Sequence, residues 1–229
     1  MKFQQITPGV FMATRSGVNV FALQTGSDIT LIDCGTPRCA PHILNAVQRL
    51  GTVRNIIVTH AHYDHAGGAA QIAAATGAPV WMHPADAQLV ARGRWRRPAH
   101  PSGSALAWVM VKLLGRLYPD TLPAVPNIKP TGDTLDIAGG IKVHHMPGHC
   151  AGQIALEWHA PDGRCVIFGA DVCMTSLGLM QPLLYEDTAE GLGSIKRLAD
   201  LARTATVVVF GHGKPLWEPG PKLARFASG

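Results

Sequence analysis

The chain has 229 residues, of which 47% are hydrophobic and 15% are charged. This composition excludes a disordered or fibrous chain and suits a single domain spanning residues 1–229, because α/β domains often exceed about 200 residues undivided. The formal net charge is +5, but segment 87–119 carries six basic and no acidic residues, which leaves 14 basic and 15 acidic residues elsewhere. One segment therefore makes the protein basic, and nucleic-acid binding is not indicated.

The cysteine content and the lengths of the apolar runs indicate the cellular compartment of the protein. The five cysteines form no C-x-x-C pair, and an odd set argues against a disulfide framework. No N-terminal stretch has the apolar length of a signal peptide, and the longest apolar run, 105–111, is far shorter than the roughly 20 residues of a membrane span. We therefore expect a cytoplasmic protein with no membrane span.

Strand-like and helix-like segments alternate along the chain, which predicts an α/β fold. Strands are expected at 10–13, 19–23, 29–33, 55–59, 79–82, 134–137, 142–146, 153–158, 165–168 and 206–210. Helices are expected at 41–50, 68–76, 85–92, 104–118 and 188–203, where proline or glycine often marks an end.

A histidine-rich segment follows the strand predicted at 55–59. His60 and His62 are two positions apart, so in an extended chain both side chains can project to one side and bind one ion. Asp64 and His65 come further round the turn and can face a second ion. Imidazole and carboxylate are the ligands expected for Zn²⁺ and related divalent metals.

Three later turns repeat this arrangement at the ends of apolar strands. His149 follows 142–146, Asp171 follows 165–168, and His212 follows 206–210, each in a glycine-containing turn. Open sheets place their sites at the carboxyl ends of strands, so we expect these residues to gather with the first four. The remaining histidines do not follow a strand in a glycine-containing turn: His42, His83, His100, His144, His145 and His159. Of the adjacent pair at 144 and 145, at most one can face the site.

The combination resembles the metallo-β-lactamase superfamily. The H-x-H-x-D-H motif is His60, His62, Asp64 and His65, followed in family order by His149, Asp171 and His212, with an early Asp33 that matches the family's first motif. The resemblance runs from about residue 10 to 215 and implies an αββα sandwich of two mixed sheets flanked by helices.

The resemblance also implies a dinuclear centre. His60, His62 and His149 would hold one metal, Asp64, His65 and His212 the other, and Asp171 would bridge both. A water shared by two such ions loses its proton near neutral pH and can attack a carbonyl or phosphoryl centre, with Asp64 and Asp171 as the catalytic carboxylates. Asp33 is expected to hydrogen-bond a ligand histidine or nearby backbone. Zinc is the favoured metal, with iron or manganese as alternatives.

The superfamily catalyses diverse reactions, and several differences between this sequence and individual branches of the superfamily reduce the number of candidate reactions. True β-lactamases with this motif lack the bridging aspartate, thioesterases of the glyoxalase II type carry a long C-terminal extension, and the superfamily's nucleases need inserted domains. Lactonases add a tyrosine soon after the bridging aspartate, whereas the nearest one here is Tyr185. We therefore expect hydrolysis of an ester-like bond (lactone, ester or thioester) in a small apolar or anionic substrate. Alternatives are a persulfide dioxygenase-like enzyme with one iron, a β-lactamase-like amide hydrolase, and a metal-binding regulator without turnover.

A basic and apolar insert at about 87–131 interrupts the pattern. Its helix at 104–118 is apolar nearly all round, so we expect it to be buried. It would form a lid beside the metals or a homodimer interface, or simply pack on the domain. The candidate pocket residues are Trp108, Met110, Leu113, Leu114 and Tyr185. Four arginines of the insert, between 92 and 97, either attract an anionic substrate or form a solvated face.

Overall fold

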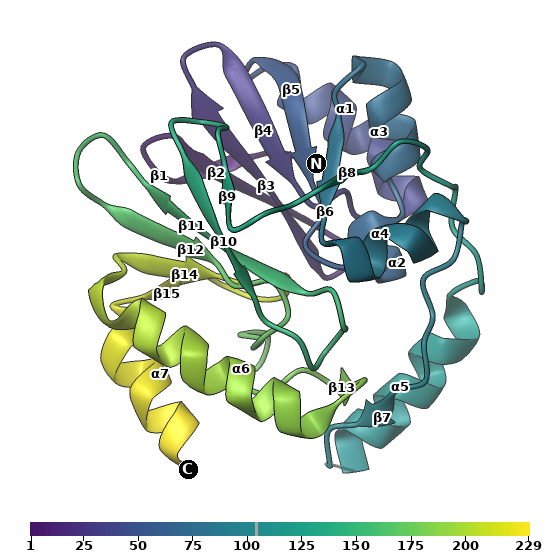
Figure 1. The fold of residues 1–229 in the computed structure, drawn as a ribbon, viewed down its shortest axis with the longest axis vertical. Coiled ribbons are helices and arrows are strands. Elements are labelled where there is room, and N and C mark those ends of the chain that lie inside the picture. The colour runs from purple at the N-terminus through teal and green to yellow at the C-terminus, as the bar shows by residue number, and fades with distance from the viewer. Residues whose placement is uncertain (104) are drawn as a thin grey trace.

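Two β-sheets lie face to face between two layers of helices in the computed structural model, which describes residues 1–103 and 105–229 (Figure 1). Within the insert, the side chains of Met110 and Leu114 are also outside the described set. The two layers of flanking helices and the sheets between them make an αββα sandwich, the architecture expected from the sequence.

The first sheet has the order β1-β2-β3-β4-β5-β6-β8. Its first four strands form an antiparallel meander, and β4, β5, β6 and β8 are parallel. The strand bounds are β1 Gln4–Thr7, β2 Val10–Arg15, β3 Val18–Thr25, β4 Asp28–Ile32, β5 Thr52–Ile57, β6 Val80–Met82 and β8 Lys129–Pro130.

The second sheet has the order β15-β14-β12-β11-β10-β9, in which only β12 and β14 are parallel neighbours. Its strands are β9 Thr134–Leu135, β10 Ile141–His145, β11 Ile154–His159, β12 Cys165–Phe168, β14 Val207–Val209 and β15 Leu216–Trp217. A separate two-stranded ribbon pairs β7 (His100–Pro101) of the insert with β13 (Leu184–Tyr185).

Alternating apolar residues fill the space between the sheets. Phe21 of β3 contacts Phe168 of β12 edge to face, with ring centroids 5.4 Å apart, and both rings are buried. Helices α1 (Ala40–Val47), α3 (Ala69–Thr76) and α4 (Pro84–Ala91) cover the outer face of the first sheet. Helices α6 (Thr188–Leu201) and α7 (Pro219–Ser228) cover the second. The chain thus has three apolar layers, each buried by neighbouring elements.

The remaining elements are the insert helix α5 (Ala105–Leu117) and three short ones: α2 (Tyr63–Ala66) and the 3-10 helices η1 (Pro37–Cys39) and η2 (Ala202–Thr204). Most expected strands and helices are present within a few residues. The strand expected at 134–137 is shorter, because a turn with left-handed Ala138 follows it. The sequence patterns missed α7 and the short strands β1, β7, β8, β13 and β15.

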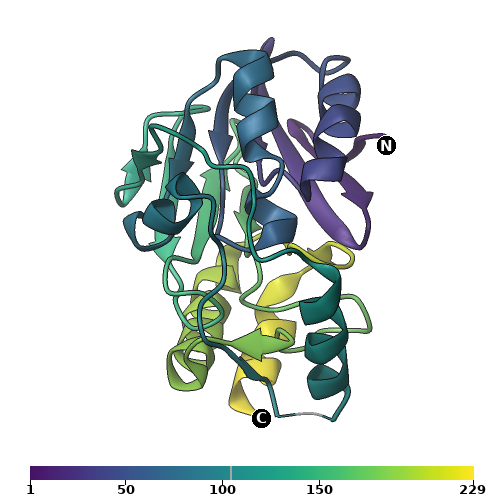
Figure 2. The same ribbon diagram turned by 90° about the vertical axis from the view of Figure 1, so that its right-hand side faces the viewer.

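The expectation that the insert helix is buried is wrong. Trp108, Val109 and Leu113 of α5 are each about half exposed, at 51%, 54% and 51%, whereas Ala107 is buried. In Figure 2, α5 lies along the outside of the molecule, with neighbouring elements on one side. An apolar helix covered on one side leaves its other apolar residues in solvent. Among the described residues, none of the helices has the length and apolar character to cross a membrane.

Backbone hydrogen bonds join the two sheets at the edge where their key strands end. The amide of Ile154, at the start of β11, donates to the carbonyl of Thr59, just after β5, at 3.0 Å. The amide of Asn19 in β3 donates to the carbonyl of Gly211, just after β14, at 2.7 Å. These bonds fix the loops after β5 and β14 against the opposite sheet.

Candidate metal centre

The histidine motif changes conformation halfway along its length. His60 and His62 come from the extended chain after β5, and His62, with φ −59° and ψ 150°, is the last residue before α2. Asp64 and His65 lie on α2. Because the backbone switches from extended to helical here, His62 and Asp64 join different groups of side chains, whereas the rings of His60 and His65 lie with their centroids 4.1 Å apart.

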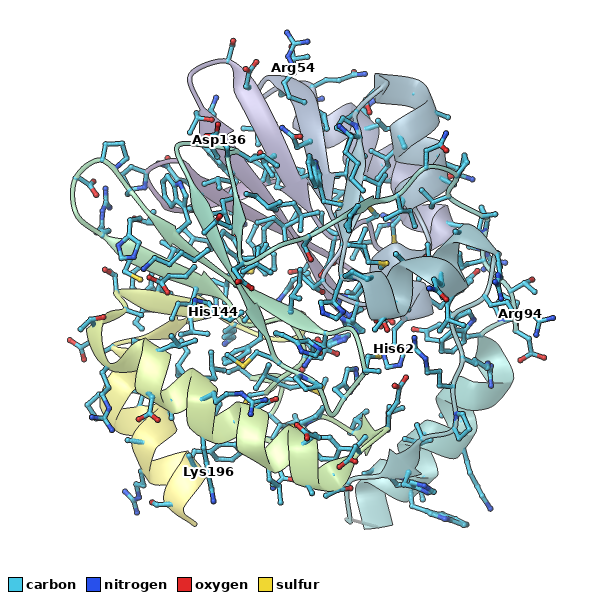
Figure 3. All side chains as sticks on the ribbon, in the orientation of Figure 1. Arg54, His62, Arg94, Asp136, His144 and Lys196 are labelled. Atoms are coloured by element: carbon cyan, nitrogen blue, oxygen red, sulfur yellow. The ribbon has the colours of Figure 1, made fainter. Side chains whose placement is uncertain are left out.

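Tertiary structure brings the three distant residues to the motif. His149 lies in the loop after β10, Asp171 in the turn after β12, and His212 in the turn after β14. In Figure 3, His62 lies on the side of the molecule where α2 and α5 are found, far from Arg54 and Asp136 at the opposite end of the sheets. The site is therefore at one edge of the sandwich.

All seven sequence-predicted ligands meet there, in overlapping groups. The donor atoms of His60, His62 and His149 lie within 4.8 Å of one another, together with the sulfur of Cys150. The same limit holds for Asp64, His65 and His212, and for Asp171 with His60 and His65.

Asp171 lies between the two groups of side chains. Its Oδ2 is 3.6 Å from His149 Nε2 and 3.2 Å from His212 Nε2, and its Oδ1 is 3.7 Å from His65 Nε2. Asp64 lies at the outer side, with Oδ2 3.6 Å from His212 Nε2. One carboxylate thus faces imidazoles of both groups.

Four histidines are held by the nitrogen that faces away from the centre. His149 Nδ1 lies 2.9 Å from the carbonyl oxygen of Leu184, and His212 Nδ1 lies 2.8 Å from that of Gly17. His65 Nδ1 lies 2.8 Å from Asp33 Oδ2, and His60 Nδ1 lies 3.0 Å from the hydroxyl of Thr59. A carbonyl or carboxylate partner fixes the proton on Nδ1, so the lone pair of Nε2 is presented to the centre.

The fully buried carboxylate of Asp33 also anchors the strand end. Its Oδ1 accepts a hydrogen bond from the amide of Thr59 at 2.8 Å, and its Oδ2 accepts one from the Thr59 hydroxyl at 2.9 Å. Asp33 has a left-handed backbone with φ 61°. Asp33 therefore connects the turn after β4 to both His65 and the loop after β5.

Three inward-facing polar atoms are buried without a hydrogen-bond partner among the described residues: His60 Nε2, His149 Nε2 and Asp171 Oδ1. Buried polar atoms are rarely left unpaired, because the lost hydration is costly. Imidazole nitrogen and carboxylate oxygen are donors that Zn²⁺ and similar ions accept. These residues therefore fit divalent metal ions.

Burial and charge act in opposite directions on the imidazoles. Burial lowers the pKa of His60 and of His62 well below the ordinary value, with the neighbouring histidines adding to the effect. Burial also lowers the pKa of His149. The first group therefore consists of neutral imidazoles, the form that binds metal.

The second group stands beside carboxylates. Although burial opposes the change, Asp171 and Asp33 raise the pKa of His65 to about 9. Asp171 and Asp64 likewise raise the pKa of His212 to about 10. Against its own burial, His212 and His65 hold the pKa of Asp171 well below its usual range. Bound cations would replace these protons as the charges that offset the carboxylates.

Cys150 is buried next to His149, and its sulfur lies 3.2 Å from His62 Nε2. The sequence patterns did not indicate this contact, nor an aromatic cluster beside the motif. The Trp95 ring meets the His62 ring edge to face, with centroids 5.8 Å apart, and Tyr118 packs on Tyr63 at 5.1 Å. The insert that supplies Trp95 and Tyr118 is therefore adjacent to the site.

The predicted pocket residues that the structure describes lie in different surroundings. Trp108 and Leu113 lie on the exposed face of α5, and the side chains of Met110 and Leu114 are outside the described residues. Tyr185 is 1% exposed and its ring packs against Gly191 of α6. The Tyr185 ring is therefore part of the core instead of lining a pocket, because β13 is covered by α6.

Neither histidine of the adjacent pair reaches the centre. His144 Nε2 lies 2.8 Å from Glu157 Oε2, and the His145 ring stacks on His83 with centroids 4.1 Å apart. Nor are the insert arginines a uniformly solvated face. Arg96 donates to the carbonyl oxygens of Gly115 and Tyr118 near the end of α5, and Arg97 bonds acidic side chains.

Comparison with known proteins identifies the family. Residues 13–169 match the family model of the metallo-beta-lactamase superfamily. The chain is 31% identical to "Probable metallo-hydrolase YflN" of Bacillus subtilis, over 91% of this chain and 85% of that protein. It is also 31% identical to a hydroxyacylglutathione hydrolase of Anaeromyxobacter dehalogenans, over 60% of this chain and 41% of that protein.

Solved structures show the same fold. A B3 metallo-β-lactamase with an active-site glutamic acid superposes with a TM-score of 0.71 at 22% identity, over 100% of this chain and 89% of that one. A metallo-β-lactamase of Cronobacter sakazakii with a HARLDQ motif gives a TM-score of 0.66 at 26% identity, over 100% and 84%. The chain belongs to the metallo-β-lactamase superfamily and is a metallo-hydrolase of that fold, which confirms the resemblance and the fold expected from the sequence.

Proposed function

We propose that this metallo-hydrolase holds two divalent metal ions, most simply Zn²⁺, and cleaves an ester-like bond of a small substrate. The observation that carries the proposal is the convergence of seven imidazole and carboxylate donors around buried, unpartnered nitrogen and oxygen atoms. When bound, the two metals would acidify a shared water and stabilise the negative charge that develops on the substrate.

Each ligand group would hold one ion. His60, His62 and His149 would bind the first metal, and Asp64, His65 and His212 the second. Asp171 would serve both, because its two oxygens face imidazoles of both groups. The carbonyls of Leu184 and Gly17 and the carboxylate of Asp33 would keep three of the rings oriented.

We assign to Asp64 the exchange of a proton with the reacting group. Its side chain is 17% exposed, against 5% for Asp171, so Asp64 stands at the outer side of the centre. A partly exposed carboxylate beside the reacting bond can accept a proton from the attacking water and pass it to the leaving group.

Lactones, esters and thioesters are the proposed substrate class. The similarity to a hydroxyacylglutathione hydrolase over 60% of this chain supports a thioester or related acyl bond. The aromatic cluster of Tyr63, Trp95 and Tyr118 beside His62 offers an apolar surface for the acyl group. Exposed Trp108 and Leu113 of α5 offer a further apolar surface, for substrate or for a second copy of the chain.

We further propose a cytoplasmic location, supported by five free, buried thiols.

Metal analysis and one substrate panel test the proposal. Protein purified without chelator should contain about two divalent ions per chain and should hydrolyse members of a panel of lactones, esters, thioesters and β-lactams. His60→Ala should lose metal and hydrolysis together, because His60 supplies a buried donor to the first group. His42→Ala is the matched control, since His42 is an exposed histidine on α1.

Other outcomes separate the alternatives. Turnover retained in His60→Ala refutes the site. One iron per chain with oxygen consumption supports dioxygenase chemistry instead, and hydrolysis restricted to β-lactams supports an amide hydrolase. Metal-loaded protein inactive on the whole panel favours a metal-binding regulator.

A further inference from the structure

Two carboxylates outside the metal centre hold the loops that carry its ligands. Asp86, in the first turn of α4, is fully buried. Its Oδ2 accepts a hydrogen bond from the amide of Ala61 at 2.8 Å, and its Oδ1 accepts one from the amide of Gly152 at 3.0 Å. Ala61 lies between His60 and His62, and Gly152 follows His149 by three residues. One side chain therefore connects both ligand loops of the first group.

The contact between Asp86 and the second loop is close. A Cβ added at Gly152 would lie 2.5 Å from Asp86 Cγ and 2.7 Å from Asp86 Cβ. Asp86 therefore packs directly against the backbone of Gly152, and a side chain at that position would force the loop and α4 apart.

Glu186 makes a second contact with the same loop. Its Oε2 accepts a hydrogen bond from the amide of Ala151 at 2.8 Å. Glu186 lies two residues after Leu184, whose carbonyl oxygen faces His149 Nδ1. The His149 loop is thus held at Ala151 by Glu186 and at Gly152 by Asp86.

Arg97 of the insert joins these two carboxylates. Its Nη1 lies 2.5 Å from Asp86 Oδ1 and 3.4 Å from Glu186 Oε1, and its Nη2 donates to the carbonyl of Ala85. The side chain of Arg97 is 23% exposed and those of Asp86 and Glu186 are 0% and 10% exposed. A buried carboxylate is strongly disfavoured without a cation, so Asp86 depends on Arg97. A guanidinium suits this place, because its fixed donors reach several acceptors at once.

We propose that Arg97 is a positioning residue for the metal centre: through Asp86 and Glu186 it fixes the loops that carry His60, His62 and His149. The insert thereby controls how tightly the first metal is held. This inference rests on the proposed metal centre and adds a second role to the insert besides contact with substrate.

The test uses zinc-loaded and cobalt-loaded full-length protein. Zinc retention against a chelator and the visible absorption of Co²⁺ report the ligand geometry without any turnover assay. Arg97→Ala should lower zinc affinity by about 10- to 100-fold, as for other side chains that support ligands, and should alter the cobalt spectrum. Arg97→Lys keeps the charge but not the fixed fork of donors, so a smaller loss in the same direction is expected.

Two controls separate positioning from general stability. Arg94→Ala removes an exposed arginine of the same segment, which points to the periphery in Figure 3, and should match the wild type. Val53→Ala removes buried volume at the start of β5, away from the loops, and should lower stability but leave the cobalt spectrum unchanged.

The outcomes are distinct. Wild-type zinc retention and cobalt spectrum in folded Arg97→Ala would overturn the proposal. If Arg97→Ala does not fold, Arg97→Lys decides: unchanged retention overturns the proposal, and weakened retention with an altered spectrum supports it. Failure of the wild type itself to bind metal would count against the proposed function instead.

Discussion

Replacing Gly211 by alanine perturbs the centre by a single methyl group, without removing a ligand. Gly211 directly precedes His212, two residues beyond β14, and its amide donates to the carbonyl of Ala170 at 2.9 Å. A Cβ at this position would lie 2.1 Å from Asp171 Oδ1 and 2.6 Å from His65 Cε1. Two proposed metal ligands therefore occupy the space that this methyl group would need.

The size of the effect follows from these distances. Ordinary contact begins near 3.4 Å, so the Asp171 oxygen or the Gly211 backbone must move by about 1.3 Å, the difference between 3.4 and 2.1 Å. Asp171 and His65 are 3% and 0% exposed, which leaves little room for the shift. Overpacking of this kind costs about 1–3 kcal/mol, so a protein of ordinary stability remains folded. A displacement of about 1 Å in a catalytic group costs on the order of 100-fold in rate.

We therefore expect Gly211→Ala to fold, to bind the second metal more weakly, and to lose about 100-fold in hydrolysis. Urea unfolding, metal content and initial rates on the best substrate of the panel measure the three quantities. Gly132→Ala is the control, because the nearest atom to its added Cβ is 4.0 Å away. Two metals bound at wild-type affinity with an unchanged rate in Gly211→Ala would refute the assigned geometry.

Two further predictions concern the charges around the centre. Asparagine at position 33 can keep the left-handed backbone but weakens the bond to His65 Nδ1, so Asp33→Asn should bind the metal held by His65 about 10- to 100-fold more weakly in chelator competition. Wild-type affinity for that metal would contradict the role of Asp33. In metal-free protein, the raised pKa values of His65 and His212 contribute stability that is complete below the ordinary pKa of 6.5 and is lost as pH rises through about 9 and 10. Because the lowered pKa values of His60 and His62 cost stability below pH 6.5, urea unfolding should show a maximum near the ordinary pKa of 6.5; stability that rises steadily to pH 10 would exclude this assignment.

Local sequence patterns predicted most of the regular structure. The strand expected at 165–168 is β12 with the same bounds, because four consecutive buried apolar residues require a central strand. The short edge strands were missed, since two-residue pairings such as β7 with β13 leave no periodicity to detect. The exposure of α5 was not predictable, because an apolar pattern says that a helix prefers burial but not whether a neighbour covers it.

Around the ligands, too, local sequence patterns do not reveal contacts that depend on the tertiary structure. An aspartate in the first turn of a helix is expected to interact with the helix end, and nothing in the local sequence indicates that Asp86 bonds two loops 25 and 66 positions away. Likewise, Arg97 belongs to a run of arginines that resembles a solvated face, and its partner Glu186 is 89 positions away.

The sequence by itself determined the donor set: the spacing of His60, His62, Asp64 and His65 is local, and three more donors follow apolar strands. Only the tertiary structure decided which donors face one another, because that depends on how β5, β10, β12 and β14 are ordered in two packed sheets. It also decided that Arg97 of the basic insert bonds Asp86 and Glu186, which accept hydrogen bonds from the loops after β5 and β10. Ligand chemistry is a property of residue types and can be read locally, whereas burial and long-range contact are properties of packing.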